Sequence, residues 1–266
     1  MPIEPRLLTV ASCNVNGVRA AVRRGMGPWL AATKPDVLCL QEVRAPDAEV
    51  AAVLGDGWSG VHAEAAAKGR AGVSVHSRVA PVAVRVGLPG FLDAGRWVEA
   101  DVPVASGVLT VCSTYVHTGE ADTPKQDEKY AFLAAMRTRL LELAADGRYV
   151  LVTGDFNICH HEVDLKNWKG NLKKSGFLPD ERAWLTALLE SGFVDVGRRL
   201  GGEGPGPYTW WSWRGQAFDN DAGWRIDYQL ASANLAARAV KASVHRAATY
   251  AQRWSDHAPV VVTYEV

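Results

Sequence analysis

Polar side chains that can bind a metal ion or move a proton follow or precede the apolar runs of this 266-residue chain at several separate places. They are carboxylates, amides and one histidine. Oxygen ligands suit a hard cation such as Mg²⁺ or Mn²⁺, and a histidine beside an aspartate can be oriented for acid–base or electrostatic work. The set therefore indicates a hydrolytic metal site, and its members are Asn14, Asn16, Glu42, Asp155, Asn157, Asp227, Asp256 and His257.

Each of these positions has a purely structural interpretation when taken alone, because polar residues commonly lead from a strand into a loop. Asp155 and Asn157 could form an Asx-turn, and His257 could be a structural histidine. The adjacent His160 and His161 do not have the spacing of a zinc site, so we expect them to lie in a loop entering a helix or turn. Only the set as a whole indicates chemistry.

The elements that must position these residues are predicted from hydrophobic patterning. Short runs rich in Val, Leu and Thr predict strands, and continuous apolar runs such as VLCL and YVLVT favour strands covered on both faces. The predicted strands are 7–11, 37–40, 72–76, 108–116, 149–153, 228–231 and 260–264.

Two helices are predicted, at 128–145 and 180–191. The first carries apolar residues at spacings of three and four, which form one stripe. The second follows Pro179, with Asp180 as the expected N-cap, and ends before Gly192. Strands and helices alternate, so the fold class is α/β or α+β with layers. No linker or charge block divides the sequence, and we expect one domain over residues 1–266.

Composition limits the possible partners. The chain has 29 Lys and Arg and 29 Asp and Glu, hence no net charge, and 48% hydrophobic residues exclude global disorder. A neutral total gives no hint of a nucleic-acid or membrane partner, so a polyanion would need a local patch. The segment 166–174 contains four lysines and no acid, which fits a solvated loop and a phosphate-binding patch equally well.

Cysteine usage and the N-terminus bear on location. Cys13, Cys39, Cys112 and Cys159 lie in or beside the apolar runs, where reduced thiols pack as small hydrophobes. No signal peptide is visible, and no apolar run approaches the roughly 20 residues that span a bilayer. We expect a cytoplasmic protein without a membrane partner.

Six segments in order match one family. CNVNGVRA, VLCLQE, STYV, TGDFNI, GWRIDY and WSDHAPV, with DLKNWKGNLKKSGFLPDER between the fourth and fifth, resemble the exonuclease III type of apurinic/apyrimidinic (AP) endonucleases, a branch of the endonuclease/exonuclease/phosphatase superfamily. GDFN and SDHAP alone indicate the superfamily, whereas PYTWWSW followed by GWRIDY favours the DNA-repair branch. The resemblance implies a four-layer α/β sandwich, two packed mixed β-sheets flanked by helices, with the site at one edge.

The resemblance also implies a metal site. By motif position, Glu42 would be the principal metal carboxylate, Asp256 would assist, and Asn14 and Asn16 would line the same pocket. The implied cofactor is Mg²⁺, for which Mn²⁺ can substitute. One-metal and two-metal schemes both fit, because a further site could use side chains from another part of the set. These are Asp155, Asn157 and His257.

The remaining catalytic roles are implied in the same way. Asp155 would orient or deprotonate the attacking water, and Asn157 would hydrogen-bond the scissile phosphate. His257 would stabilise charge on the phosphate, with Asp227 holding the other side of its imidazole. Tyr115 would lie close to the phosphate and assist the leaving group.

Substrate contacts complete what the resemblance implies. Trp210, Trp224 and Ile226 would form an apolar slot for a deoxyribose that carries no base, since an abasic nucleotide flips out of the duplex at low cost. Trp211 is predicted to lie in the core. Contacts with the DNA backbone are expected from Arg96, Asn171, Lys173 and Lys174.

The function implied by the resemblance is Mg²⁺-dependent cleavage of duplex DNA on the 5′ side of abasic sites, with 3′→5′ exonuclease and 3′-end-cleaning activity. The expected partner is double-stranded DNA with abasic sites or blocked 3′ ends, bound by a monomer that associates with the nucleoid when it acts on DNA. The alternatives are another superfamily hydrolase, such as a nonspecific DNase, a lipid or inositol phosphatase, or an RNA 3′ exonuclease, and a catalytically silent DNA-binding protein. The intact set of polar residues argues against the silent protein.

Overall fold

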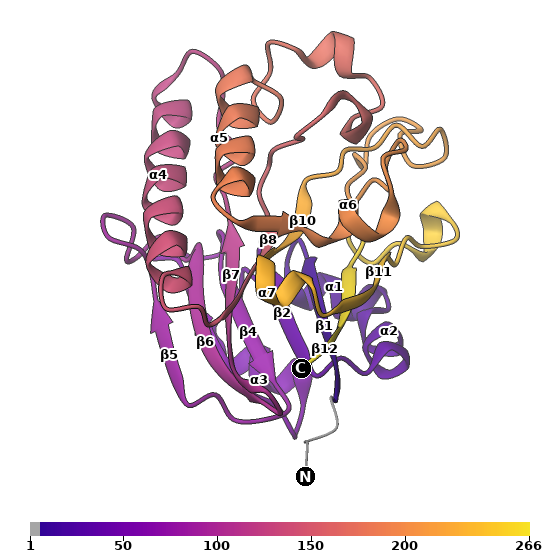
Figure 1. Cartoon of the computed structure of the whole chain (residues 1–266). Coiled ribbons are helices and arrows are strands. Elements are labelled where there is room, and N and C mark those ends of the chain that lie inside the picture. Colours follow the sequence, from indigo (N-terminus) through magenta and orange to yellow (C-terminus); the bar gives the residue numbers. More distant parts are fainter. Residues whose placement is uncertain (1–5) are drawn as a thin grey trace.

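Two six-stranded mixed sheets pack face to face in the computed structural model, which describes residues 6–266 (Figure 1). The first sheet has the order β11-β12-β1-β2-β4-β3, and the second has the order β5-β6-β7-β8-β10-β9. The strands of the first are Ala239–Val244, Val260–Glu265, Leu7–Asn14, Val37–Gln41, Val73–Ser77 and Ser59–Ala63. Those of the second are Ala83–Val86, Trp97–Val104, Gly107–Tyr115, Tyr149–Asp155, Asp227–Ser232 and Phe193–Asp195.

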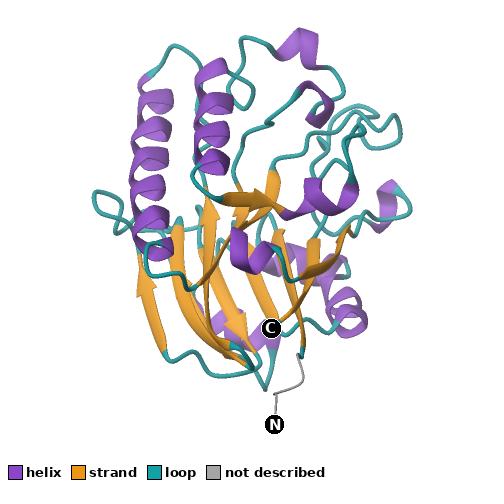
Figure 2. Ribbon diagram, viewed as in Figure 1, coloured by secondary structure: helices purple, strands orange, loops and turns teal. Residues whose placement is uncertain are grey.

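Helices cover the outer face of each sheet. The long helices α4 (Pro124–Ala144) and α5 (Pro179–Glu190) run side by side over the second sheet, and α1 (Val18–Arg24), α2 (Met26–Thr33) and α3 (Asp47–Leu54) lie on the first (Figure 2). Shorter helical elements occupy the connections, and they are α6 (Val196–Gly201), α7 (Ala233–Ala236) and the 3₁₀ turns Glu162–Asp164, Trp168–Asn171 and Tyr250–Gln252. The predicted four-layer α/β sandwich is confirmed.

The alternation of side chains along each strand explains the continuous apolar runs. In β2, Val37 and Cys39 pack between the sheets, while Leu38 and Leu40 pack under the helices of the first sheet. Both faces of a central strand are therefore dry, so every position of the run must be apolar. All four cysteines are buried free thiols, as expected. Within residues 6–266 no helix is both long and apolar enough to span a membrane.

Apolar patterning predicts seven strands, and it misses the four strands at the sheet edges and the interior strand β6. Strands β3, β5, β6, β9 and β11 were not predicted, and the reason is visible in two of them. β5 alternates half-buried with exposed residues, and β9 has only three residues, so neither presents a long apolar run. The expectation that Asp180 caps the second helix is wrong. Helix α5 begins at Pro179, and Glu181 accepts a hydrogen bond from the backbone N–H of Leu178 (2.9 Å), so the N-cap is Leu178, two residues before Asp180.

Gly154 shows how tightly the second sheet is built near the polar end of β8. Its φ is +140°, and a Cβ at this position would lie 2.0 Å from the carbonyl oxygen of Thr114 on the neighbouring strand β7. Glycine alone satisfies both the backbone angle and the close approach.

Replacing this glycine tests that interpretation. We expect Gly154→Ala to lower the free energy of unfolding by about 3 kcal/mol, because strain at the backbone and a steric clash both act against the folded state. Gly27→Ala is the matched control, since Gly27 lies in α2 and a methyl group added there would have no neighbouring atom within 4 Å. Urea unfolding measures both, and equal midpoints for the two variants would contradict the interpretation.

Candidate active site

Strand directions bring the polar set to one end of the two sheets, where the long loops gather (Figure 2). β1 and β2 are parallel, with Asn14 paired to Gln41, so Glu42 follows at the same edge. β7 and β8 are also parallel, and Tyr115 is paired to Asp155. The observed strands continue into these polar residues, beyond the ends predicted from the apolar pattern. The reason is that backbone pairing between neighbouring strands does not require apolar side chains.

Asn14 joins the two sheets at this edge. Its Nδ2 donates to Glu42 Oε1 at 2.9 Å and to Asp155 Oδ2 at 3.0 Å, while its Oδ1 accepts from the backbone N–H of Asn16 at 3.0 Å. The side chain is fully buried and does not line the cavity described below. Asn14 therefore orients the carboxylates of Glu42 and Asp155 from behind.

His257 forms an ion pair with Asp227 and faces Asp155. The Nδ1 of His257 lies 2.9 Å from Asp227 Oδ2, and its Nε2 lies 3.8 Å from Asp155 Oδ2. Burial alone would lower the pKa of His257, but the carboxylates of Asp227 and then Asp155 outweigh it and raise the pKa to about 10. The imidazole is therefore charged at neutral pH and can stabilise negative charge in the cavity.

Asp155 has the opposite environment. Burial raises its pKa to about 7, opposed by the nearby His257 and reinforced by Asp227 and Glu42. A carboxyl group that titrates near neutral pH is suited to accept a proton from water. Its Oδ1 accepts from the backbone N–H of Asn157 at 2.9 Å, which is the Asx-turn considered for these two residues. The turn and the chemistry coexist, because the other oxygen remains directed at Asn14 and His257.

Asp256 forms the opposite wall with two donors. Asn16 Nδ2 lies 2.9 Å from Asp256 Oδ1, and the indole Nε1 of Trp210 lies 3.1 Å from Oδ2.

Tyr115 also lines the cavity. Burial and then the carboxylates of Glu42 and Asp155 raise the pKa of Tyr115, so its hydroxyl stays protonated and can donate a hydrogen bond.

Left-handed backbone conformations are concentrated at this site. Eight non-glycine residues of the described chain have positive φ, and four of them line the cavity, namely Asn16, Glu42, Arg44 and Asn157. Each such residue costs of order 1–3 kcal/mol and persists only where the surroundings hold it. The strain therefore marks these four side chains as fixed in direction by the fold.

The polar groups surround a cavity of about 270 Å³. Ten of the predicted residues line it, and they are Asn16, Glu42, Tyr115, Asp155, Asn157, Trp210, Trp224, Ile226, Asp256 and His257. The rings of Trp210 and Trp224 meet edge to face at 6.2 Å, which gives the apolar side of the cavity. Trp211 is buried away from it, as predicted.

The remaining predicted residues lie around the cavity instead of in it. Asp227 is behind His257, and Arg96 stacks on the Tyr115 ring (4.6 Å) and donates to the backbone carbonyl of Tyr115 (3.2 Å). Lys173 and Lys174 are exposed, and Asn171 donates to the carbonyl of Asn167. The structure does not bring these three to the cavity, although the chain reaches its wall at the next residues.

Sequence reasoning missed four residues that line the cavity, which are Arg44, Thr118, Ser175 and Gly176. Arg44 stands two residues after Glu42, and its Nη2 pairs with Glu42 Oε2. Gly176 has φ +93°, and a Cβ there would lie 3.0 Å from the Trp224 ring. The signals were present in VLCLQEVR and KKSG, directly beside the family motifs, but only the fold shows which neighbours turn inward.

The donor set fits a hard divalent cation. Glu42 and Asp256 present carboxylate oxygens to the cavity, and such oxygens are the ligands that hard cations prefer. Glu42 already forms an ion pair with the guanidinium of Arg44. A second group, Asp155, Asp227 and His257, has candidate ligand atoms within 4.8 Å of one another, and Asp227 Oδ1 is buried without a hydrogen-bond partner. Both one-cation and two-cation arrangements are compatible with these residues.

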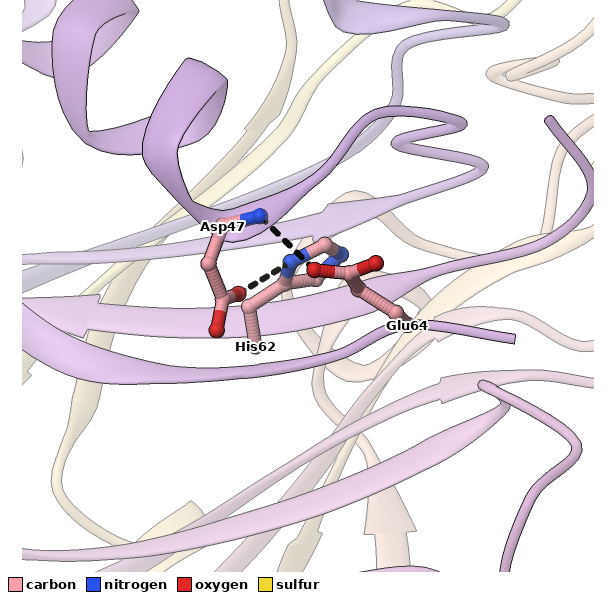
Figure 3. A group of neighbouring side chains, drawn as sticks. All are labelled: Asp47, His62 and Glu64. Atoms are coloured by element: carbon pink, nitrogen blue, oxygen red, sulfur yellow. Dashed lines mark hydrogen bonds and ion pairs between the residues drawn. The ribbon is translucent and has the colours of Figure 1, made fainter. Parts of the chain in front are cut away.

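A third group, Asp47, His62 and Glu64, has a structural explanation (Figure 3). His62 Nδ1 lies 2.6 Å from Asp47 Oδ1, and Glu64 Oε1 accepts from the backbone N–H of Asp47 at 2.9 Å. Because Asp47 is the first residue of α3, these contacts fix the start of that helix against β3 and the residue that follows it.

Comparison with known proteins places the chain in a class. The model of the endonuclease/exonuclease/phosphatase family matches residues 11–257. Among solved structures, a Neisseria 3′ phosphatase, NExo, bound to a product DNA hairpin superposes with a TM-score of 0.87 at 30% identity, over 97% of this chain and 100% of that one. An AP endonuclease from Archaeoglobus fulgidus gives a TM-score of 0.84 at 30% identity, with the same coverage. The chain belongs to the endonuclease/exonuclease/phosphatase family and is a hydrolase of phosphodiester bonds.

Two relatives that match most of this chain narrow the assignment to one branch of the family. An exodeoxyribonuclease of Bacillus subtilis is 32% identical over 259 residues, which is 95% of this chain and 98% of the relative. The DNA repair nuclease APEX1 of Danio rerio is 30% identical over 264 residues, 96% of this chain and 81% of the relative. The resemblance to exonuclease III-type AP endonucleases is therefore confirmed.

The charge state of His257 gives a direct test of the site. We expect its imidazole in the EDTA-treated protein to remain protonated to about pH 10, whereas burial lowers the pKa of His76 and His160 to about 4. Protonation of His257 then stabilises the fold fully below about pH 6.5, and this contribution is lost as the pH rises through 10. Nitrogen-15 NMR of the imidazoles measures all three residues. A His257 resonance that titrates near pH 6.5 would refute the ion pair with Asp227.

Proposed function

We propose that the chain is a divalent-metal-dependent DNA repair phosphodiesterase that cuts duplex DNA on the 5′ side of abasic sites, leaving a 3′ hydroxyl. A 3′→5′ exonuclease activity that also cleans blocked 3′ ends accompanies it. The observation that carries this proposal is the buried pairing of Asp227, His257 and Asp155 beside an apolar slot. The relatives named above supply the DNA-repair context.

The hydrolytic step follows from the geometry of the side chains. Water attacks the phosphorus and its proton passes to Asp155, whose pKa of about 7 allows it to accept that proton near neutral pH. The bond from phosphorus to the 3′ oxygen breaks, and the phosphate remains on the 5′ side of the abasic sugar. The 3′ oxygen takes up a proton from solvent, and Asp155 then releases to solvent the proton that it accepted. Water and the phosphodiester are thereby converted to a 3′ hydroxyl and a 5′ phosphate.

Charge on the phosphate is stabilised by fixed donors. The imidazolium of His257 faces the cavity, and Tyr115 carries a protonated hydroxyl because burial raises the pKa of its phenol. Asn157 lines the same wall, held by the strained backbone described above. Donors that are already oriented need no reorganisation as charge develops, which is the largest source of catalysis in such sites. A Mg²⁺ ion, or Mn²⁺ in its place, would be held by Glu42 and Asp256, with Asn16 beside them in the cavity lining and Asn14 behind, and it supplies further positive charge when bound.

The slot between Trp210, Trp224 and Ile226 supports selection of an abasic nucleotide. Gly176 allows Trp224 to approach the wall closely, and we propose that the apolar surface formed there accepts a sugar that carries no base. The exposed Lys173 and Lys174, with Asn171 and Arg96, are proposed to contact the DNA backbone on either side. We further propose that the protein acts as a single domain and a monomer, in the cytoplasm, on DNA of the nucleoid.

The incision assay tests the function directly. A labelled duplex with one tetrahydrofuran abasic analogue should be cut on its 5′ side in Mg²⁺ and left intact in EDTA. His257→Ala should lower kcat by about a thousandfold or more while Kd for the DNA changes by only a few fold, because the residue acts on developing charge.

His160→Gln is the control for that variant, since His160 is a buried histidine that bonds Thr186 outside the cavity. Hydrolysis of inositol phosphates or RNA in place of EDTA-sensitive incision would contradict the proposal. Parallel loss of DNA binding and cleavage in His257→Ala would show that its role is misassigned.

The lysine segment generates a separate prediction. Lys173→Ala and Lys174→Ala should each weaken DNA binding uniformly across sequences and reduce the slope of log K against log salt by about 0.9, since each removes one phosphate contact. Lys241→Ala, an exposed lysine on β11, should leave the slope unchanged. Fluorescence anisotropy between 50 and 200 mM salt measures the three variants, and equal slopes would assign the segment to a solvated loop.

A further inference from the structure

A fully buried ion pair lies directly behind one wall of the cavity. Lys129 on α4 and Glu181 on α5 are both 0% exposed, and Lys129 Nζ lies 2.6 Å from Glu181 Oε1. Lys129 also donates to the backbone carbonyls of Asn157 (2.8 Å) and Thr118 (3.2 Å). Burying two charges costs desolvation that their attraction offsets only in part, so stability by itself is a poor reason for such a pair.

Glu181 binds the segment on the other side of the same wall. Its Oε2 accepts from the backbone N–H groups of Gly176 (2.7 Å) and Leu178 (2.9 Å), and its Oε1 lies 3.0 Å from the hydroxyl oxygen of Ser175. Gln126 Nε2 adds a further hydrogen bond to Oε1 at 3.0 Å. The carboxylate therefore fixes both the start of α5 and the turn that precedes it.

The groups held by this pair come from three separate segments that meet at the cavity. Thr118 follows β7, Asn157 follows β8, and Ser175 and Gly176 precede α5, and all four residues line the cavity. Ser175 joins two of the segments, because its hydroxyl donates to the Thr118 carbonyl at 2.5 Å. One ion pair thus fixes a whole wall of the site without facing the cavity itself.

Asn157 depends most on this support. Its φ of +50° is a strained conformation for a residue with a side chain, and its neighbours must maintain it. Lys129 holds its carbonyl, Asp155 holds its N–H, and the Val116 carbonyl accepts from its Nδ2 at 3.0 Å. Loss of the lysine contact frees the peptide group whose rotation would turn the Asn157 amide away from the phosphate position.

We propose that Lys129 and Glu181 are positioning residues for phosphodiester cleavage, which hold Asn157 and the Ser175–Gly176 wall in the orientation that the reaction requires. Neither residue touches the substrate. The inference rests on the proposed function, because it concerns the rate of that step.

The double variant Lys129→Met/Glu181→Gln separates positioning from stability. Lys129→Met alone leaves a buried, unpaired carboxylate and should lower both the thermal midpoint and kcat. The double variant removes both charges, so its thermal midpoint should return close to the wild-type value. Its kcat for incision of the abasic duplex should remain 10- to 100-fold low, with KM changed less than threefold, since the Asn157 carbonyl still lacks its donor. A double variant that regains wild-type kcat together with stability overturns the proposal.

The control pair joins the same helix, α4, to strand β6. Arg139 on α4 contacts the buried Glu99 through two hydrogen bonds of 2.7 and 2.9 Å, and neither residue lines the cavity. Arg139→Met/Glu99→Gln should change the thermal midpoint and leave kcat within twofold of wild type. An equal fall in kcat here would assign the effect to general loosening of α4 and overturn the proposal.

A single variant and the wild-type protein complete the test of the positioning role. Glu181→Gln alone should lower kcat at least fivefold, and it tests the same contacts if the double variant does not fold. The wild-type protein is assayed first on the abasic duplex. Absence of incision there refutes the proposed function, whereas incision by the wild type with unchanged kcat in Glu181→Gln and in the double variant refutes only the positioning role.

Discussion

Four carboxylates, from Glu42, Asp155, Asp227 and Asp256, meet at one largely buried edge of two packed sheets, and their mutual repulsion is the constraint that the rest of the site must satisfy. Negative charges this close are tolerated only when each has a partner or binds a proton or cation. His257 is paired with Asp227, Arg44 with Glu42, and Asn16 and the Trp210 indole with Asp256. Burial raises the pKa of Asp155 to about 7, although the nearby His257 opposes the shift.

The same constraint links stability and chemistry. A site that compensates negative charge imperfectly attracts divalent cations, and it also keeps one carboxyl group ready to exchange a proton near neutral pH. The amide of Asn14 is central to this balance, because it ties Glu42 in one sheet to Asp155 in the other. The relative position of the two sheets therefore sets the distance between the carboxylates, and the apolar core between the sheets sets the relative position.

Neutral overall charge is consistent with a protein that acts on a polyanion. Several acidic side chains are withdrawn into the site, whereas Lys166, Lys169, Lys173 and Lys174 are exposed on one segment that ends at the cavity wall. The zero net charge conceals this difference in location, because it sums acidic side chains that are buried with basic side chains that are exposed. Such a distribution favours short-range contacts with DNA over long-range attraction.

The sequence by itself determined the layers and the chemical inventory. Continuous apolar runs are dictated by strands with two dry faces, so seven of the eight interior strands could be found, and six ordered motifs were enough to select the family. Marginal strands such as β5 escaped because an edge strand needs few apolar residues, and the cap of α5 was misplaced because a glutamate within the helix replaced the expected Asp180. These are errors of local pattern, and packing resolved them.

Only the tertiary structure decided which polar residues act together. Arg44 and Ser175 turn into the cavity, Asn14 withdraws behind it, and Lys129 with Glu181 supports it from two helices, although nothing in the spacing of these residues distinguishes them from solvated surface groups. The physical reason is that a side chain's partners depend on where separate segments meet, and chain order alone does not encode those distances. Strand ends could be predicted as polar, but the left-handed backbone at Glu42 and Asn157 that aims them becomes visible only in three dimensions.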